Sequence, residues 1–506
     1  MSELPELPDH LNCFFKPEFY PHPVEQIEMM QTHISWVFLT GRFAYKIKKP
    51  VNFGFLDFSS LQQRKQFCER ELRLNRRLSP DIYIEVLAVS LHGNKCTLGG
   101  ESHIVDYCLK MQQFRQSDLL DNRLADNHFN PAWVDQLAGK IARFHRREEA
   151  VNNSRIDAGL LLDEHIQDNL AVGEKHVGRA LSYATMQQLS DYAEQACAEL
   201  SELLNGRQTD GFVRRCHGDL HLQNITLFNY QPQLFDCIEF NDEYSMIDVM
   251  NDVAFLMMDL DAHQRPDLAM RLISRYLEHT GDYPGLKLLR YYLYYRACVR
   301  GKVACLLAAE LEKEKQPPLY AQAKQYFALA ASYTTAGEAK LFAVGGLSGS
   351  GKSHLALLGC GPERAVIIRS DATRKRIAAD YPELELYGKA MHINTYNAMF
   401  EAGRIALNAG FSVILDATFT HPDSRRQLRL LSEACHAPLC FFWLDIDVET
   451  LKQRIAGRQK AADDISDADL RVLNLQLAEY KRPAETWIQF VSSSNRWPQD
   501  TMNCAL

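Results

Sequence analysis

One glycine-rich segment, residues 346–353, constrains the fold of this chain more than any other part of its sequence. It reads GLSGSGKS and satisfies the pattern G-x-x-x-x-G-K-S, whose glycines let backbone N–H groups curve around phosphate oxygens. The apolar run 341–344 before it predicts a buried strand, and the residues from Ser353 onward predict a helix whose N-terminus faces an anion. We therefore expect a strand, a phosphate-binding loop and a helix in succession.

The residues of this segment have separate expected roles toward a bound nucleotide. The lysine of the pattern bridges β- and γ-phosphate oxygens, and the final serine holds magnesium. The residues expected to contact the phosphates of ATP are Gly346, Gly349, Gly351, Lys352 and Ser353. Asp416 ends a later strand-like run, and we expect its carboxylate to reach Mg²⁺ or a water bound to it.

Strand-like and helical segments alternate in the last third of the chain. Apolar runs of strand length occur at 341–344, 365–368, 412–415 and 439–444, with helical segments between them. This alternation predicts βαβ units and a parallel sheet, the α/β layout of a P-loop NTPase fold. The chain exceeds the size of a single core, and we place a domain boundary near residue 336, which gives predicted domains 1–335 and 336–506.

A second motif lies in the middle of the chain, where residues 217–224 read HGDLHLQN. A kinase aligns the γ-phosphate with an attacking hydroxyl, neutralises the triphosphate with Mg²⁺ and offers a carboxylate to the departing proton. Asp219 is the candidate base, Asn224 is a candidate metal ligand, and Asp236, beyond a short hairpin, is a candidate second metal carboxylate. The Asp and Asn of the protein-kinase catalytic loop have the same spacing.

Because the match includes the His-Gly pair that opens this motif, the chain resembles the aminoglycoside phosphotransferases and related small-molecule kinases over about residues 30–300. The resemblance implies a bilobal, protein-kinase-like α+β fold. It also implies that Lys46 contacts the phosphates of ATP and that Glu71 is the ion-pair partner of that lysine on a helix. Lys48 lies on the same strand face, and the sequence leaves open which lysine contacts phosphate.

Two departures from that family concern the nucleotide site. No G-x-G-x-x-G precedes Lys46, so we expect only a short loop over the phosphates. Residues 236–239 read DCIE where a protein kinase has DFG, which leaves the role of Glu239 open. His217 is expected to be a buried hydrogen-bonding residue, because the base of this motif is its aspartate.

The C-terminal part resembles the P-loop kinases of the polynucleotide 5′-hydroxyl kinase and zeta-toxin type over nearly all of residues 340–490. The likeness rests on the segment IRSDATR at 368–374, on the DAT at 416–418 with arginines after it, and on RIAGR at 454–458. It implies that Asp371 is a general base. It also implies that substrate or phosphate is contacted by Arg374 and Arg425, and that the lid arginines toward ATP are Arg454 and Arg458.

Composition limits the classes of partner. The chain has 506 residues, 46% of them hydrophobic, and a net charge of −8, which does not favour a polynucleotide partner and leaves a small-molecule hydroxyl acceptor as the expected one. It has no apolar stretch of membrane-spanning length and no basic, apolar leader pattern, so we expect a cytoplasmic protein without a membrane partner.

These observations favour an ATP-dependent phosphotransferase with two ATP and Mg²⁺ sites, one in each domain. Each site would transfer a γ-phosphoryl group to a hydroxyl. Two alternatives remain at this stage. One domain could be a nucleotide-binding regulator of the other, or the P-loop domain could phosphorylate the 5′-hydroxyl of a nucleic acid. The sequence does not identify either acceptor or the oligomeric state.

Overall fold

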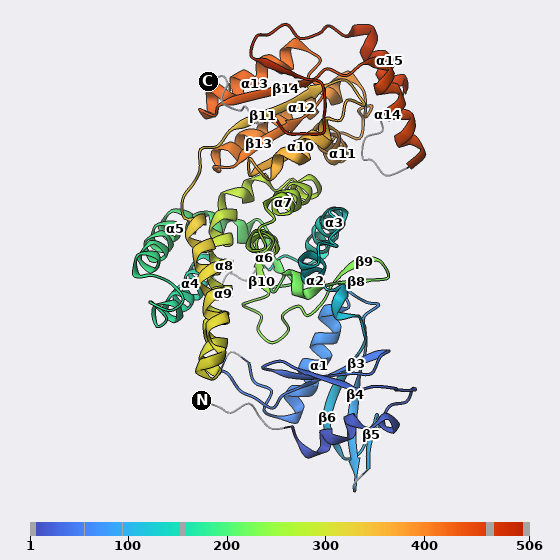
Figure 1. Cartoon of the computed structure of the whole chain (residues 1–506), viewed down its shortest axis with the longest axis vertical. Helices are drawn as coiled ribbons and strands as arrows, with labels where there is room; N and C mark the ends of the chain where they lie inside the picture. Colours follow the sequence, from blue (N-terminus) through green and yellow to red (C-terminus); the bar gives the residue numbers. More distant parts are fainter. Residues whose placement is uncertain (1–6, 55, 94, 152–156, 462–469, 499–506) are drawn as a thin grey trace. The chain divides into compact units, whose positions relative to one another are not determined.

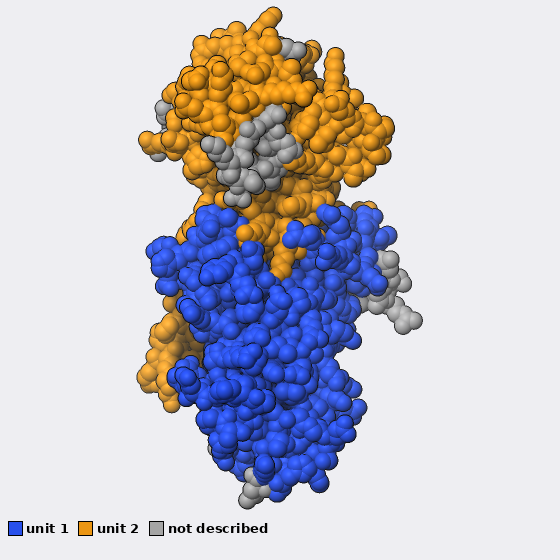
Figure 2. All heavy atoms as spheres, turned by 90° about the vertical axis from the view of Figure 1, so that its right-hand side faces the viewer, with its two compact units in different colours: residues 1–133, 143–154, 207–252 blue, residues 134–142, 155–206, 253–506 orange. Residues whose placement is uncertain are grey.

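The computed structural model describes residues 7–54, 56–93, 95–151, 157–461 and 470–498 (Figure 1). The chain divides into two compact units, which Figure 2 shows in different colours. One unit comprises residues 1–133, 143–154 and 207–252, and the other comprises residues 134–142, 155–206 and 253–506. The boundary predicted near residue 336 falls inside the latter unit, so the division at that residue stays a prediction.

A six-stranded antiparallel sheet opens the first unit, with strand order β1-β2-β3-β6-β4-β5. Gly41, at φ 86°, turns the chain between the second and third strands, as the sequence predicts. Phe14, Trp36, Phe38 and Tyr45 form the centre of its core. The strands are β1 (Glu28–Gln31), β2 (Ser35–Leu39), β3 (Phe43–Lys48), β4 (Tyr83–His92), β5 (Lys95–Leu98) and β6 (Ile104–Gln112).

Helix α1 (Leu61–Asn75) packs against β4 and β6. A capping box starts it: Gln63 donates its backbone N–H to the Ser60 hydroxyl, and the Gln63 side chain accepts from the Ser60 backbone N–H. The face that this helix buries carries Glu71, which is the carboxylate expected to pair with a lysine of β3. The capping box defines where the helix begins and thereby which of its residues, including Glu71, face the interior.

Helices make up most of the middle of the chain. Two short antiparallel strand pairs interrupt them, β7 (Val213–Arg215) with β10 (Met246–Asp248) and the hairpin β8 (Ile225–Phe228) with β9 (Gln231–Leu234). Among the described residues, no helix combines the length and the apolar character that crossing a bilayer requires. The helices are α2 (Leu120–Ala125), α3 (Ala132–Arg147), α4 (Ala158–Glu174), α5 (Tyr183–Thr209), α6 (Val249–Ala262), α7 (Pro266–Thr280), α8 (Leu286–Glu310) and α9 (Pro317–Tyr333).

A five-stranded parallel sheet forms the core of the C-terminal part, in the order β12-β13-β11-β14-β15, which confirms the predicted P-loop layout. The strands are β11 (Leu341–Gly346), β12 (Ala365–Arg369), β13 (Ser412–Asp416), β14 (Leu439–Leu444) and β15 (Ile488–Val491). The helices are α10 (Lys352–Cys360), α11 (Ser370–Ile377), α12 (Lys389–Asn408), α13 (Pro422–Cys435), α14 (Val448–Ala461) and α15 (Leu470–Glu479). The P-loop, Asp371 and Asp416 follow or end β11, β12 and β13, so all three lie at the carboxyl ends of the parallel strands.

Candidate active sites

The phosphate loop connects β11 to α10 and depends on three glycines. Gly346, Gly349 and Gly351 have φ values of 140°, 86° and 93°, a region that side chains other than glycine rarely adopt. A Cβ on Gly351 would lie 2.5 Å from the Ser494 hydroxyl oxygen, and a Cβ on Gly349 would lie 3.0 Å from the Leu451 carbonyl oxygen. The glycines therefore allow both the curvature of the loop and its close packing.

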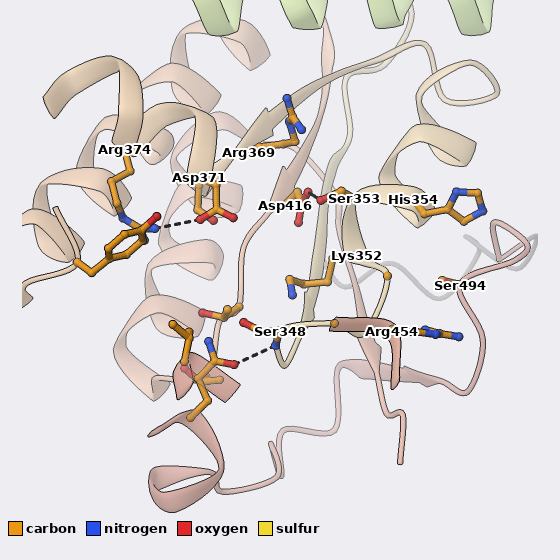
Figure 3. A pocket seen from close by; sticks show the side chains of 18 of the residues that line it. Ser348, Lys352, Ser353, His354, Arg369, Asp371, Arg374, Asp416, Arg454 and Ser494 are labelled. Atoms are coloured by element: carbon orange, nitrogen blue, oxygen red, sulfur yellow. Dashed lines mark hydrogen bonds and ion pairs between the residues drawn. The ribbon is translucent and has the colours of Figure 1, made fainter. Parts of the chain in front are cut away.

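The Lys352 and Ser353 side chains make bonds to two different parts of the site. The Ser353 hydroxyl donates to Asp416 Oδ2 at 2.6 Å (Figure 3). Lys352 Nζ donates to the Leu347 carbonyl at 3.0 Å. Burial raises the pKa of Asp416, although Lys352 and the Ser353 hydroxyl act in the opposite direction. A buried carboxylate next to a hydroxyl oxygen is a donor set that fits Mg²⁺.

A cavity of about 1040 Å³ opens beside the loop. Its volume is at the upper end of the range for a pocket that encloses one drug-sized ligand, so it can hold a nucleotide and a second molecule. The predicted residues that line it are Gly349, Gly351, Lys352, Ser353, Asp371, Arg374, Asp416 and Arg454. The structure thus brings most of the predicted P-loop residues to one cavity.

Asp371 and Arg374 lie on the first turns of α11 and face each other. Arg374 Nη1 donates to Asp371 Oδ1 at 3.0 Å, and the guanidinium lies 5.2 Å from the centre of the Tyr387 ring. The Asp371 side chain is 37% exposed, so a substrate hydroxyl can approach it, whereas only 11% of the Arg374 side chain is exposed. This arrangement suits a carboxylate base whose position is set by a neighbouring arginine.

Arg425 is placed differently from the sequence-based expectation. It lies outside the group of described residues that line the cavity, and only 5% of it is exposed. Its guanidinium donates to the carbonyls of Phe419 and Thr420 and to Glu485 Oε1, at distances of 3.0, 2.9 and 2.6 Å. Because two carbonyls of the loop after β13 and the Glu485 carboxylate accept these bonds, the geometry gives Arg425 a structural role and does not support a substrate contact.

The structure describes the side chain of only one of the two predicted lid arginines. Arg454 Nη1 donates to the Ser350 carbonyl of the phosphate loop at 3.0 Å, so α14 is tied directly to the loop. The side chain of Arg458 lies outside the described part of the chain. Gly346 ends β11 and shapes the loop, but the lining of the cavity begins two residues later, at Ser348.

Sequence reasoning missed one residue at the phosphate loop. Gln476 Oε1 accepts the backbone N–H of Ser348 at 2.9 Å, and both residues line the cavity (Figure 3). Leu473, three residues before Gln476 on α15, packs with Leu347 of the loop. Helical spacing from that apolar residue was the one available signal, because no motif marks a polar residue on α15.

The second constellation lies in the first unit, around the two lysines of β3. Lys46 Nζ donates to Glu71 Oε1 at 2.8 Å and to Asp236 Oδ1 at 2.6 Å. Lys48 Nζ donates to Glu71 Oε2 at 2.7 Å and to Glu239 Oε1 at 2.5 Å. The predicted pairing of a strand lysine with a helix glutamate is present, and both lysines take part in it.

Exposure distinguishes the two lysines. The Lys48 side chain is 1% exposed and lies between two buried glutamates, whereas Lys46 is 11% exposed and contacts Asp236, whose side chain is 42% exposed. Glu239, whose role the sequence left open, is the second carboxylate of the buried lysine. The geometry favours Lys46 for contact with a phosphate, because it reaches the candidate metal carboxylate.

Burial and charge oppose each other at Glu71. Burial alone raises the pKa of a carboxyl group, but the ammonium groups of Lys46 and Lys48 lower the pKa of Glu71 from 4.5 to about 2. Glu71 therefore stabilises the folded state above pH about 4.5, and this stabilisation is lost as the pH falls towards about 2.

We expect Glu71→Gln to lower the free energy of unfolding by about 3 kcal/mol at pH 7, because it leaves two buried ammonium groups without their shared carboxylate. The difference from the wild type should shrink as the pH is lowered from about 4.5 towards 2. Urea unfolding at a series of pH values measures it. Glu69→Gln is the matched control, because Glu69 lies on the same helix with 56% of its side chain exposed. Equal effects of the two substitutions would contradict the assignment.

The Asp and Asn of the central motif meet as predicted. Asn224 Nδ2 donates to Asp219 Oδ2 at 2.8 Å and to the Asp219 carbonyl at 2.9 Å. His221 Nε2 lies 3.3 Å from the same carboxylate oxygen, and 38% of the Asp219 side chain is exposed. The carboxylate is held in place and remains accessible to a substrate, while Asn224 itself is buried.

Buried bonds fix the backbone of this loop. Asp252 accepts the backbone N–H of His217 at 3.1 Å and that of Gly218 at 2.8 Å. His217 Nε2 donates to the Phe235 carbonyl at 3.0 Å, and burial lowers the pKa of His217, so a neutral ring with a structural role is favoured. Gly218 has φ 84°, and a Cβ there would lie 2.6 Å from a backbone carbonyl oxygen.

Comparisons with known proteins agree with these two constellations. Residues 55–289 match the model of the Phosphotransferase enzyme family, and residues 341–483 match that of the AAA domain. Uncharacterized protein Rv2004c of Mycobacterium tuberculosis is 30% identical over 458 residues, which cover 88% of this chain and 89% of that protein. Uncharacterized protein Mb2027c of Mycobacterium bovis matches with the same values.

Two solved kinase structures match this chain at low TM-scores. Choline kinase from Cryptosporidium parvum Iowa II has a TM-score of 0.40 at 12% identity, and the match covers 64% of this chain and 94% of that one. The APS kinase CysC of Mycobacterium tuberculosis has a TM-score of 0.24 at 18% identity, covering 31% of this chain and 90% of that one. From the similarity along most of its length and the two family matches, the chain belongs to the same family as the mycobacterial proteins and is a kinase in which a phosphotransferase-family domain precedes an AAA-type P-loop domain.

Proposed function

We propose that this kinase has two ATP and Mg²⁺ sites, one in residues 1–335 and one in residues 336–506, and that each transfers a γ-phosphoryl group to a hydroxyl of a small molecule. The observation that carries the proposal is that each half of the chain groups a candidate base with candidate metal ligands and a lysine. A site for regulation alone needs no base. The nucleotide supplies the phosphoryl group. The residues of each site bind and orient the two reactants and accept the proton of the hydroxyl.

In the first site, Asp219 accepts the proton of the acceptor hydroxyl. Asn224 and Asp236 are the candidate holders of Mg²⁺, and Lys46 is the candidate phosphate contact. The support is the bond that holds the Asp219 carboxylate to Asn224 at 2.8 Å and the bond of Lys46 to Asp236 at 2.6 Å. Positioning and electrostatic stabilisation then account for most of the expected rate enhancement.

In the second site, Asp371 is the candidate base and Arg374 orients it. Ser353 and Asp416 are the candidate holders of Mg²⁺, Lys352 is the candidate phosphate contact, and Arg454 donates to the Ser350 carbonyl of the phosphate loop. The support is the 2.6 Å bond between Ser353 and Asp416 at the edge of a cavity large enough for two ligands.

The test is ATP consumption by the full chain, screened against a library of small-molecule alcohols in the Lys352→Ala and the Asp219→Asn variants separately. The proposal expects distinct acceptors that each depend on one of the two residues. A single acceptor lost in both variants would favour one site regulated by the other. Acceptance of oligonucleotides, with binding that weakens steeply as salt rises, would instead identify a nucleic-acid kinase.

A further inference from the structure

Helix α7 packs against the edge strand β12 of the parallel sheet, within the second unit. The Ser274 hydroxyl oxygen of this helix accepts the backbone N–H of Ile367 in β12 at 2.9 Å. The helix lies in the segment that matches the phosphotransferase family, whereas the strand lies in the segment that matches the AAA domain. The P-loop sheet therefore has a neighbour from the preceding segment of the chain.

A buried ion pair joins the same two elements. Arg369, the last residue of β12, donates through Nε and Nη2 to the two carboxylate oxygens of Glu278 on α7, both at 2.5 Å. The two side chains are 10% and 6% exposed. A guanidinium that donates two parallel bonds to one carboxylate is held in both position and orientation.

Glu278 is itself held by further charges. Arg275 donates to both of its carboxylate oxygens, at 2.8 and 3.0 Å, and also to Asp135 on α3. Although burial opposes its ionisation, Glu278 has a lowered pKa because Arg369 and Arg275 stabilise its charge. Glu278 is therefore an anion with a fixed place.

Arg369 also borders the P-loop cavity and lies two residues before Asp371 in the sequence. Figure 3 shows its side chain near that of Asp416, whose charge it stabilises. Asp416 is buried and already bonds the Ser353 hydroxyl. Besides Glu278, the carboxylates of Asp416 and Asp135 also attract Arg369. If Arg369 lost Glu278 and moved to Asp416, its guanidinium would compete with Mg²⁺ for the same oxygens.

We propose that Glu278 is a positioning residue of the P-loop site: it holds Arg369 at the border of the cavity and away from Asp416, which leaves that carboxylate available to Mg²⁺. This inference rests on the proposed function of the P-loop site. It means that the site is completed by a helix that precedes the predicted boundary at residue 336, so a fragment cut there lacks one of the charges that organise it.

The test uses the full chain and measures how binding of a non-hydrolysable ATP analogue to the P-loop site depends on Mg²⁺ concentration. Lys46→Ala and Asp236→Asn are present throughout to remove binding at the first site, and Lys352→Ala defines the signal of the P-loop site. Glu278→Gln keeps the size of the side chain but removes its charge. We expect the Mg²⁺ concentration at half-maximal binding to rise about fivefold or more.

Two substitutions on the same helix serve as controls. Arg271→Gln breaks a bidentate pair with Asp135 without touching Arg369, and Ser274→Ala removes the bond to Ile367 without changing a charge. Both should leave the Mg²⁺ midpoint within about twofold of the parent. Glu278→Asp, which keeps the charge, should restore part of the shift, and thermal unfolding of all variants reports any general loss of stability.

The outcomes are distinguishable. An unchanged Mg²⁺ midpoint in Glu278→Gln, or an equal shift in Ser274→Ala, overturns the inference and leaves the proposed function standing. Should Glu278→Gln fail to fold, Arg369→Gln replaces it. With no guanidinium left to compete, its midpoint should stay at or below that of the parent, and a fivefold rise would overturn the inference. Absence of any Lys352-dependent binding in the parent contradicts the proposed function, and the inference with it.

Discussion

Replacing Lys352 with alanine should reduce ATP turnover at the P-loop site at least about a hundredfold. The lysine lies in the cavity at the start of α10, where its ammonium group can neutralise charge on the transferring phosphoryl group. The bond between Ser353 and Asp416 should remain, because it does not involve Lys352. Turnover that depends on Asp219 should persist. Assaying ATP consumption with an acceptor specific to each site measures both effects.

Lys452→Ala is the matched control for this prediction. Lys452 lies on α14 in the same part of the chain, and 47% of its side chain is exposed. It should retain the activity of the wild type, because a weak surface pair contributes little. If Lys352→Ala kept its P-loop activity, or lost no more of it than Lys452→Ala, the assignment of the phosphate loop would be wrong.

Asp219→Asn should lower turnover at the first site by about 10²- to 10⁴-fold, the contribution of a well-placed general base. The substitution preserves size, and an amide oxygen can still accept the bond from Asn224, so the loop should keep its conformation. The affinity for ATP should therefore change much less than the turnover rate. Steady-state kinetics combined with binding of a non-hydrolysable analogue separates the two quantities.

Asp242→Asn is the control for that experiment. Asp242 belongs to the same unit, pairs with Arg70 and Arg215 and has a side chain that is 48% exposed. Its substitution should leave the turnover at the first site unchanged within about twofold. Equal losses from the two substitutions would show a general structural effect, and an active Asp219→Asn protein would remove Asp219 as the base.

Local sequence patterns predicted most of the fold. The turn at Gly41, the strands around it and four strands of the parallel sheet lie within a few residues of their expected places. Hydrophobic periodicity and glycine at a left-handed position are local signals that a sequence carries directly. The edge strand β15 was not predicted, because it has only four residues and its pairing with β14 is set by tertiary contacts.

Two motifs predicted candidate site residues that the structure places next to each other. Asp219 with Asn224, and Ser353 with Asp416, are each joined by a side-chain bond. Arg425 was not predictable as a structural residue, because an arginine on a helix can equally face a cavity or the carbonyls of a neighbouring loop. The choice is made by packing between elements, which leaves no local trace in the sequence.

The partner of Arg369 was also beyond the sequence. Arg369 and Glu278 are separated by 91 residues and lie on opposite sides of the predicted domain boundary. No periodicity or motif links a helix of the phosphotransferase-like part to an edge strand of the P-loop sheet. Lys46 and Lys48 lie on the same face of β3, so the sequence did not distinguish them. Their exposure and their second carboxylate partners, Asp236 and Glu239, distinguish them only in the folded structure.

The central claim is that one polypeptide carries two separate nucleotide sites, and counting bound nucleotides tests it most directly. Calorimetric titration of the full chain with a non-hydrolysable ATP analogue and Mg²⁺ should give two molecules bound per chain. Lys352→Ala and a variant that combines Lys46→Ala with Asp236→Asn should each bind one, through the site left intact. One molecule per wild-type chain, or loss of all binding in either variant, would contradict the account.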